Sequence, residues 1–251
     1  MLDAAALAAA AQLARSAGVE LAALFVEDIN LLRLASLPFA REMGAASAAL
    51  RQIDAAGIER ALTVQAAQLK SALAEAAQRL DLQWTFEVAR GQGLRVLLER
   101  SSASDIVVLA GGAGRPPWQP ALEALLRGTF SFERAPRARV AVVLGGGLEA
   151  MRVLSVAHTL ARASNAELVL LIAGEKTIAG DIAKRAAAWL RERGAAARIT
   201  PMPDHAPARI AELIGRERPQ ALFWPGADRE LSSVEISALA SVINCPLIFV
   251  R

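Results

Sequence analysis

The sequence of 251 residues contains no tyrosine and only one cysteine, and aromatic residues make up 4% of it. A single cysteine, Cys245, excludes an internal disulfide, and with only His158 and His205 beside it the chain cannot form a tetrahedral zinc cluster. Few aromatic side chains leave few surfaces on which nucleic-acid bases could stack. A cysteine-poor composition is typical of a reducing compartment, so we expect a cytoplasmic protein without a metal.

The sequence also has no long apolar run and no run of basic residues. No apolar stretch approaches the ~20 residues that span a bilayer. The alanine-rich start carries Asp3 and no basic segment, which predicts a helix rather than a signal peptide. Lys and Arg number 28 against 25 acidic residues and are spread along the chain. We therefore expect neither a membrane nor a nucleic acid as partner.

Hydrophobic residues form 54% of the chain, and their spacing alternates between helical and strand periods. Regular alternation of this kind predicts an α/β fold with parallel sheets and right-handed crossovers. The expected strands are Val19–Val26, Gln83–Ala89, Ile106–Ala110, Val140–Leu144, Glu167–Ile172, Ala197–Thr200, Ala221–Trp224 and Pro246–Val250. The expected helices cover residues 2–13, 45–80, 94–100, 121–127, 148–162, 178–193, 206–216 and 231–243. Residues 45–80 are expected to form either one long helix or two helices with a break near Gly57.

A pattern near the amino end recurs in the second half of the chain. Ala14-Arg15, Glu20-Leu21 and Leu24 have the same spacing as Ala161-Arg162, Glu167-Leu168 and Leu171. The chain is therefore interpreted as two copies of one α/β unit, residues 1–137 and 138–251. The first copy is longer, largely because of the amphipathic segment Ile29–Met43 and the long helix after it.

A glycine-rich turn follows the expected strand Ile106–Ala110. Gly111, Gly112 and Gly114 free the backbone at the carboxyl end of a buried strand, where open α/β sheets bind ligands. Backbone N–H groups in such a turn can approach an anion. A strand-to-loop turn without a ligand explains the same residues, so the turn alone leaves both interpretations open.

The two units resemble universal stress proteins over nearly the whole chain. The stretches that carry the resemblance are ELAALFVED (Glu20–Asp28), DIVVLAGGAG (Asp105–Gly114), RVAVVLGG (Arg139–Gly146) and NCPLIFVR (Asn244–Arg251). The resemblance implies a tandem of two units, each a parallel sheet of order 3-2-1-4-5 flanked by helices. It also implies association through the fifth strand, here Pro246–Val250. We expect the two units to pair there, and the same strand offers an edge for a homodimer.

ATP-binding members of that family hold the phosphates with G-x-x-G after the fourth strand and a later G-[S/T]. Gly111 and Gly114 match the first element, and Gly128 and Thr129 supply the second. The spacing departs from the family pattern, because residues 115–127 with three prolines separate the two elements.

Each unit lacks a different half of the implied nucleotide pocket. The first unit has no first strand, since Met1 already lies at the start of the helix that follows it. In the second unit Gly145-Gly146 stand where the family has an aspartate, and no G-x-x-G follows Trp224. We expect a non-catalytic stress-response or regulatory protein with an unidentified protein partner and no cofactor. The alternative is an ATP-binding protein with weak ATPase or autophosphorylation activity at Gly111, Gly114, Gly128 and Thr129.

The missing first strand would be the central strand of its sheet. We therefore expect Leu21–Val26 and Ile106–Leu109 either to pair directly or to accept a strand from elsewhere, because buried N–H and C=O groups need partners. Val140–Leu144 is one candidate donor.

Other residues with reactive side chains are expected to be structural. Gly145–Ala150 distantly resembles the SGGxDS loop of ATP pyrophosphatases, but the hydroxyls of that loop are absent. His158 lies among apolar residues of a helix and His205 in a proline-flanked loop, and neither has a nucleophile at a readable spacing. Cys245 is expected to be structural, and Trp118 and Trp224 to pack in the core or over a strand end.

Overall fold

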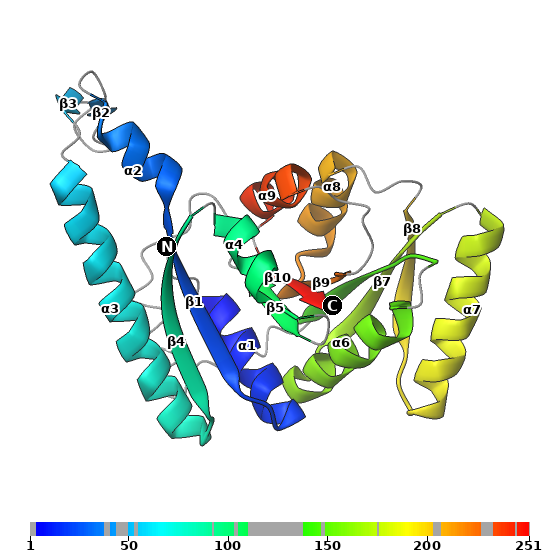
Figure 1. Cartoon of the computed structure of the whole chain (residues 1–251). Helices are drawn as coiled ribbons and strands as arrows, with labels where there is room; N and C mark the ends of the chain where they lie inside the picture. Colours follow the sequence, from blue (N-terminus) through cyan, green and yellow to red (C-terminus); the bar gives the residue numbers. More distant parts are fainter. Residues whose placement is uncertain are drawn as a thin grey trace.

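The computed structural model shows an α/β fold in which one large sheet carries most of the core (Figure 1). It describes residues 4–37, 41–43, 50–52, 55–91, 93–102, 105–109, 138–146, 149–174, 176–202, 207–226, 233–243 and 245–250.

The large sheet has the strand order β5-β10-β9-β6-β7-β8. Its strands are β5 (Ile106–Leu109), β6 (Arg139–Leu144), β7 (Glu167–Ala173), β8 (Ala197–Met202), β9 (Ala221–Pro225) and β10 (Leu247–Val250). The strands of the second unit are parallel to their neighbours and have the order 3-2-1-4-5 implied by the resemblance. β5 comes from the first unit and pairs with β10 in antiparallel orientation, Val107 opposite Phe249.

Helices cover both faces of the large sheet, which explains why its strands are continuously apolar. The helices of the second unit are α6 (Ala150–Ser164), α7 (Lys176–Glu192), α8 (Pro207–Glu217) and α9 (Ser233–Val242). Side chains alternate along each strand: Val140 and Val142 pack with α6 and α7, whereas Ala141 and Val143 pack with α8 and α9. Asn165 ends α6 in the left-handed conformation at φ 52°, a conformation that asparagine tolerates.

Apart from β5, the described strands of the first unit form two small sheets. β1 (Leu21–Asp28) and β4 (Trp84–Gly91) make a parallel pair, and β2 (Arg41–Met43) and β3 (Leu50–Gln52) make an antiparallel pair. Its helices are α1 (Ala4–Ala17), α2 (Ile29–Ala35), α3 (Ala55–Leu80) and α4 (Gly93–Arg100). In Figure 1 the β1–β4 pair and α3 form one side of the molecule and the large sheet the other, with α1 and α4 between them.

Helix α1 connects the two sheets through opposite sides of its surface. Leu7 packs with Leu73 of α3, whereas Ala9 and Leu13 belong to the buried cluster that contains Leu154 of α6. Alanine at this contact lets two helices approach closely. The first helix of the chain is therefore part of the core of the second unit.

The strand arrangement confirms one expectation for the first unit and corrects the others. β5 accepts a strand from elsewhere, because it pairs with β10 of the second unit. β1 does not pair with β5, and β6 is not donated to either of them, because β6 pairs with β7 on one edge and β9 on the other. Within the described residues no strand lies between β1 and β5. The two edges of β10 are both occupied within the chain, by β9 and β5, so a homodimer through this strand would have to displace β5.

The predicted helix over residues 45–80 begins later than expected. α3 starts at Ala55, and Leu50–Gln52 before it forms β3. The helical spacing of apolar residues extends over Leu50–Gln52, but this segment pairs with Arg41–Met43 in antiparallel orientation. Strand pairing therefore overrides the local helical pattern there. The expected helix at residues 121–127 lies outside the described residues.

An ionic network ties together the amino ends of three strands. Arg139 of β6 lies 3.4 Å from the carboxylate of Glu167 on β7 and 3.2 Å from that of Glu217 in the last turn of α8. The Arg139 guanidinium also donates to the backbone carbonyl of Glu217 at 3.0 Å, and Arg198 of β8 contacts Glu217. This network lies at the end of the sheet opposite the carboxyl ends of the strands, so it organises the fold and not a ligand site.

Candidate functional site

The second unit has its sheet switch point between β6 and β9, and open α/β sheets bind ligands at that place. β6 ends at Leu144, and Gly145 and Gly146 follow it. β9 ends at Pro225, and the N–H of Gly226 donates to the carbonyl of Val250 at 2.8 Å. That donor is therefore committed to the fold and is not available to a phosphate.

The beginning of α6 is unfavourable for an anion as well. A helix amino end attracts phosphate through its free N–H groups and its dipole. Here Glu149 occupies the cap position with no side-chain capping bond, and its carboxylate is 3.9 Å from Arg152. A carboxylate at this position repels a bound phosphate and satisfies the helix dipole itself. No aspartate stands at the end of β6, because that position is Gly145.

The predicted phosphate-binding residues of the first unit lie outside the described part of the chain. Gly111, Gly114, Gly128 and Thr129 all fall in residues 110–137. β5, the strand that precedes them, is described, but within the described residues no first strand stands beside it. The wall that the first strand would contribute to a nucleotide pocket is thus absent from the described part of this unit.

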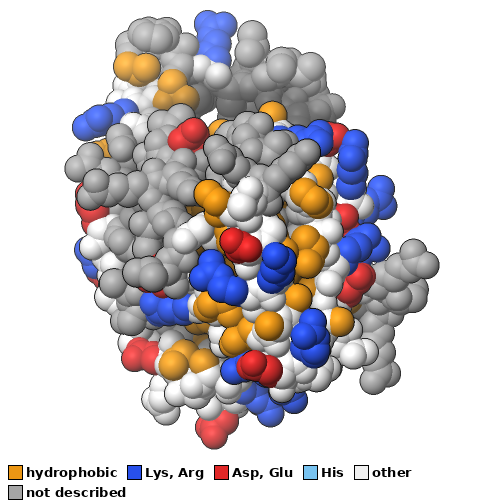
Figure 2. Space-filling model, turned by 90° about the vertical axis from the view of Figure 1, so that its right-hand side faces the viewer, with side chains coloured by type: hydrophobic (Ala, Val, Ile, Leu, Met, Phe, Trp, Pro, Cys, Tyr) orange, Lys and Arg blue, Asp and Glu red, His pale blue; other side chains and the backbone are white. Residues whose placement is uncertain are grey.

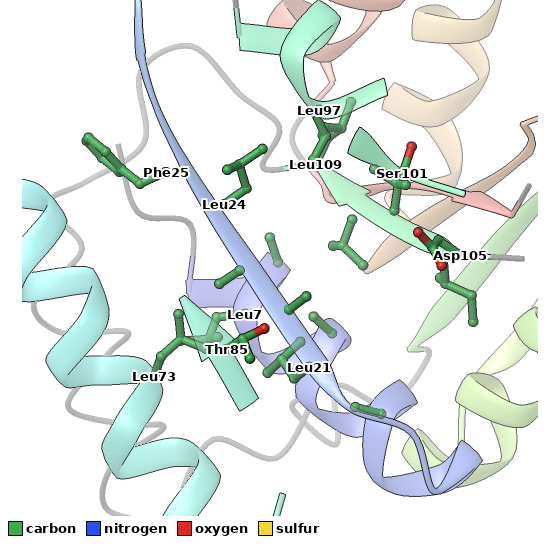
Figure 3. A pocket seen from close by; sticks show the side chains of 18 of the residues that line it. Leu7, Leu21, Leu24, Phe25, Leu73, Thr85, Leu97, Ser101, Asp105 and Leu109 are labelled. Carbon is green, nitrogen blue, oxygen red and sulfur yellow. The ribbon is translucent and has the colours of Figure 1, made fainter. Parts of the chain in front are cut away.

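A groove lies between the two sheets, where β1 faces β5 (Figure 3). Its volume is about 1160 Å³. In Figure 3 Leu24 of β1 lies across the groove from Leu97 of α4 and Leu109 of β5. Leu7 and Leu73 line its other end, so most of the lining is apolar. Its polar groups include the ion pair of Glu87 with Arg100, and Asp105, which accepts from the backbone N–H of Ser102 at 2.7 Å.

Sequence reasoning identified the abnormal first sheet but missed this groove. The only signal was indirect: an apolar, strand-like segment at 21–26 without a second strand to cover its other edge. α1 packs on α6 and also lines the groove between β1 and β5.

His158 is buried in α6, and among the described residues its Nε2 has no hydrogen-bond partner. Its exposed fraction is 7%, and its ring meets Trp189 edge-on at a centroid distance of 5.5 Å. The guanidinium of Arg193 stacks on the Trp189 ring, with its Cζ 3.9 Å from the ring centroid. Burial lowers the pKa of His158 below its ordinary value of 6.5, and the charges of Arg162 and Arg193 lower it further. The expectation of a packed, structural histidine is confirmed.

This environment predicts a pH-dependent stability. The folded protein holds His158 neutral, whereas the unfolded chain takes up a proton near the ordinary pKa of 6.5. The stability that neutral His158 contributes is fully present above pH 6.5 and is lost as the pH falls toward the lower pKa of His158 in the folded protein. We expect the free energy of unfolding, measured by urea titration, to decrease from about pH 7.5 to about pH 5.5. His158→Leu should flatten the slope, and equal slopes for both proteins would contradict this assignment.

Two of the remaining candidates, Trp224 and Cys245, belong to the core. Trp224 is 1% exposed and Cys245 is 2% exposed, so neither lines a ligand site. His205 and Trp118 lie outside the described residues. Among the residues that are described, no group of three or more His, Cys, Asp and Glu side chains could hold a metal ion.

The described residues on one face of the molecule carry charges of both signs. Figure 2 shows basic and acidic side chains interspersed on one face of the molecule. None of the described helices is both long and apolar enough to cross a membrane.

Comparison with known proteins identifies the fold. No protein-family model and no curated protein matches the sequence. A universal stress protein from Archaeoglobus fulgidus DSM 4304 is 9% identical, with a TM-score of 0.51 over 98% of this chain and 93% of that one. A universal stress protein solved in complex with cAMP is 19% identical, with a TM-score of 0.37 over 44% of this chain and 95% of that one.

A universal stress protein from Pseudomonas aeruginosa UCBPP-PA14 is 13% identical, with a TM-score of 0.39 over 94% of each chain. The match to the protein from Archaeoglobus fulgidus DSM 4304 spans almost the whole chain and shows the fold. The chain therefore has the α/β fold of universal stress proteins.

Proposed function

We propose that this chain is a tandem universal-stress-type protein that acts by binding another protein and does not depend on ATP. The observation that carries the proposal is the switch point of its complete second unit. There Gly145 replaces the expected aspartate, the Gly226 N–H donates to the carbonyl of Val250, and Glu149 places a carboxylate at the amino end of α6.

The loss of a few hydrogen bonds is enough to weaken a nucleotide site strongly. A nucleotide site at a sheet switch point takes contacts from the turn after the first strand and from the loop after the fourth. Each lost hydrogen bond removes ~1 kcal/mol, more where a charge takes part, and 1.4 kcal/mol corresponds to a tenfold change in affinity. The loss of the contacts from one of these two loops raises the dissociation constant of a micromolar site toward the millimolar range.

We expect calorimetric titration with ATP and Mg²⁺ to give a dissociation constant above about 100 μM. We also expect no nucleotide absorbance near 260 nm in small molecules released from the pure protein. Both results follow from the loss of one wall in each unit.

The alternative, ATP binding by the glycine-rich loop of the first unit, makes the opposite prediction. It requires a low-micromolar constant that Gly114→Val abolishes. Gly180→Ala is a matched control, because a Cβ added at this position in α7 meets no atom within 4 Å. Tight binding that survives in Gly180→Ala and disappears in Gly114→Val would replace our proposal with an ATP-dependent one.

A further inference from the structure

The groove between β1 and β5 runs along the edges of two strands and not across the face of either. Every residue from 21 to 26 of β1 and from 106 to 109 of β5 lines it. Side chains alternate between the faces of a strand, so a pocket on one face would be lined by every second residue. The groove is therefore a gap in the sheet layer itself.

Helices close this gap from both sides, as they do for a strand within a doubly wound sheet. α1 lines one side with Leu7, Ala10 and Leu13, and it belongs to the helix layer of α6. Leu97 of α4 and Ile236 of α9 line the other side and belong to the opposite helix layer. The space has the position and the surroundings of one missing strand.

Both edges carry hydrogen-bonding groups without strand partners. Among the described strands, β1 pairs only with β4, and β5 pairs only with β10. The Leu21 N–H donates to the carbonyl of Gln83 at 2.9 Å, on the β4 side. Because successive N–H groups point in opposite directions along a strand, those of Ala22, Leu24 and Val26 point into the gap. An added strand would give partners to both edges at once.

The second unit shows which kind of strand fits this position. β6 lies between β7 and β9, and its residues from 140 to 144 are fully buried. Its first residue, Arg139, pairs with Glu167 at the start of β7. The internal repeat places Glu20 at the position of Glu167, and Glu20 is exposed and forms no ion pair with any described residue. A basic residue at the start of the incoming strand would meet this carboxylate.

We propose that the gap binds an extended segment of another polypeptide, a basic residue followed by about five apolar residues, parallel to β1. This inference rests on the proposed function as an interaction protein and adds to it the surface and the chemistry of the partner. The strand β6 of a second copy does not supply the segment, because β6 is paired on both edges and buried in its own sheet.

The probe is a fluorescent peptide with the sequence of residues 136–144, PRARVAVVL. We expect saturable 1:1 binding by fluorescence anisotropy. Hydrogen exchange should slow at the amides of Ala22, Leu24 and Val26, while the amides of Leu21 and Ala23, which point toward β4, stay unchanged. Methylating the peptide nitrogens at alternate residues should weaken binding about fivefold to tenfold for each donor removed.

A variant of the protein tests the same edge. Ala22→Pro removes one N–H that points into the gap and leaves the β4 side intact, so we expect about tenfold weaker binding. Ala22→Val keeps the N–H and should bind as the parent does. Glu20→Lys should weaken binding of this peptide. The same variant should not weaken binding of a second peptide that carries Arg139→Glu. If Ala22→Pro unfolds, the methylated peptides decide, because they leave the protein unchanged.

Three results would overturn the inference. Protection of Ala22, Leu24 and Val26 in the free protein would mean that the chain covers its own edge. Protection that rises with protein concentration would indicate a second copy. Binding of oleate without binding of the peptide would make the gap a pocket for apolar ligands. If the protein binds both ATP tightly and the peptide, only the proposed independence of ATP is wrong. If it binds neither ATP nor the peptide, only the inference about the gap is wrong.

Discussion

Phe223→Ala is expected to lower the free energy of unfolding by about 3–5 kcal/mol. Phe223 lies in the middle of β9 with no exposed surface, opposite Val142 of β6 and Ile248 of β10. Removing its ring leaves a cavity between the sheet and α6, where neighbouring side chains are already tightly packed. A change of this size approaches the total stability of many domains.

Urea unfolding followed by circular dichroism measures this effect. Ile199→Ala is the matched control, because Ile199 lies on the edge strand β8 of the same sheet and is 40% exposed. We expect the control to cost less than about 1 kcal/mol. A loss below ~1 kcal/mol for Phe223→Ala would mean that β9 is not the buried centre of the sheet.

Leu13→Ala is expected to cost about 2–5 kcal/mol and to destabilise both halves of the chain together. Leu13 is 4% exposed and lies in α1, yet it packs into the cluster that contains Leu154 and Leu160 of α6. The contact joins residues of the first unit to the core of the second. The β5–β10 pairing adds a second connection, so we expect one cooperative unfolding transition.

Hydrogen exchange read separately for β1 and for β7 tests this coupling. Protection should fall in both strands for Leu13→Ala and in neither for Ser16→Ala, an exposed change in the same helix. Loss of protection in β1 alone, with β7 unchanged, would show that the halves unfold independently and that α1 does not stabilise the second unit.

Sequence reasoning predicted the second unit well because its local and tertiary signals agree. Continuous apolar runs such as Val140–Leu144 are typical of strands covered on both faces, and the structure places helices on both faces of β6. The alternation of strand and helix patterns predicted the α/β class, and the apolar neighbours of His158 predicted its burial. The order 3-2-1-4-5 was implied by the resemblance to universal stress proteins, and the second unit shows it. The absence of the aspartate at Gly145 was also visible in the sequence alone.

The arrangement of the first unit was decided by tertiary structure. Residues 21–26 and 106–109 have the composition of strands, but composition does not determine which edge pairs with which. β5 joins β10 because the fifth strand of the second unit offers a free edge, and β1 stays with β4. β6 remains in its own sheet, where both of its edges find partners in β7 and β9.

The sequence by itself determined most of the helices and strands, because these depend on residue types at short spacing. It also predicts the internal repeat and the degenerate nucleotide motifs. Tertiary structure alone decided that α1 packs on α6 and that a gap of strand dimensions separates β1 from β5. The physical reason is that a strand edge is made of backbone groups, which are the same for every residue except proline. Side-chain patterns therefore predict which faces are buried, while the pairing of edges depends on which strands the packed helices bring together.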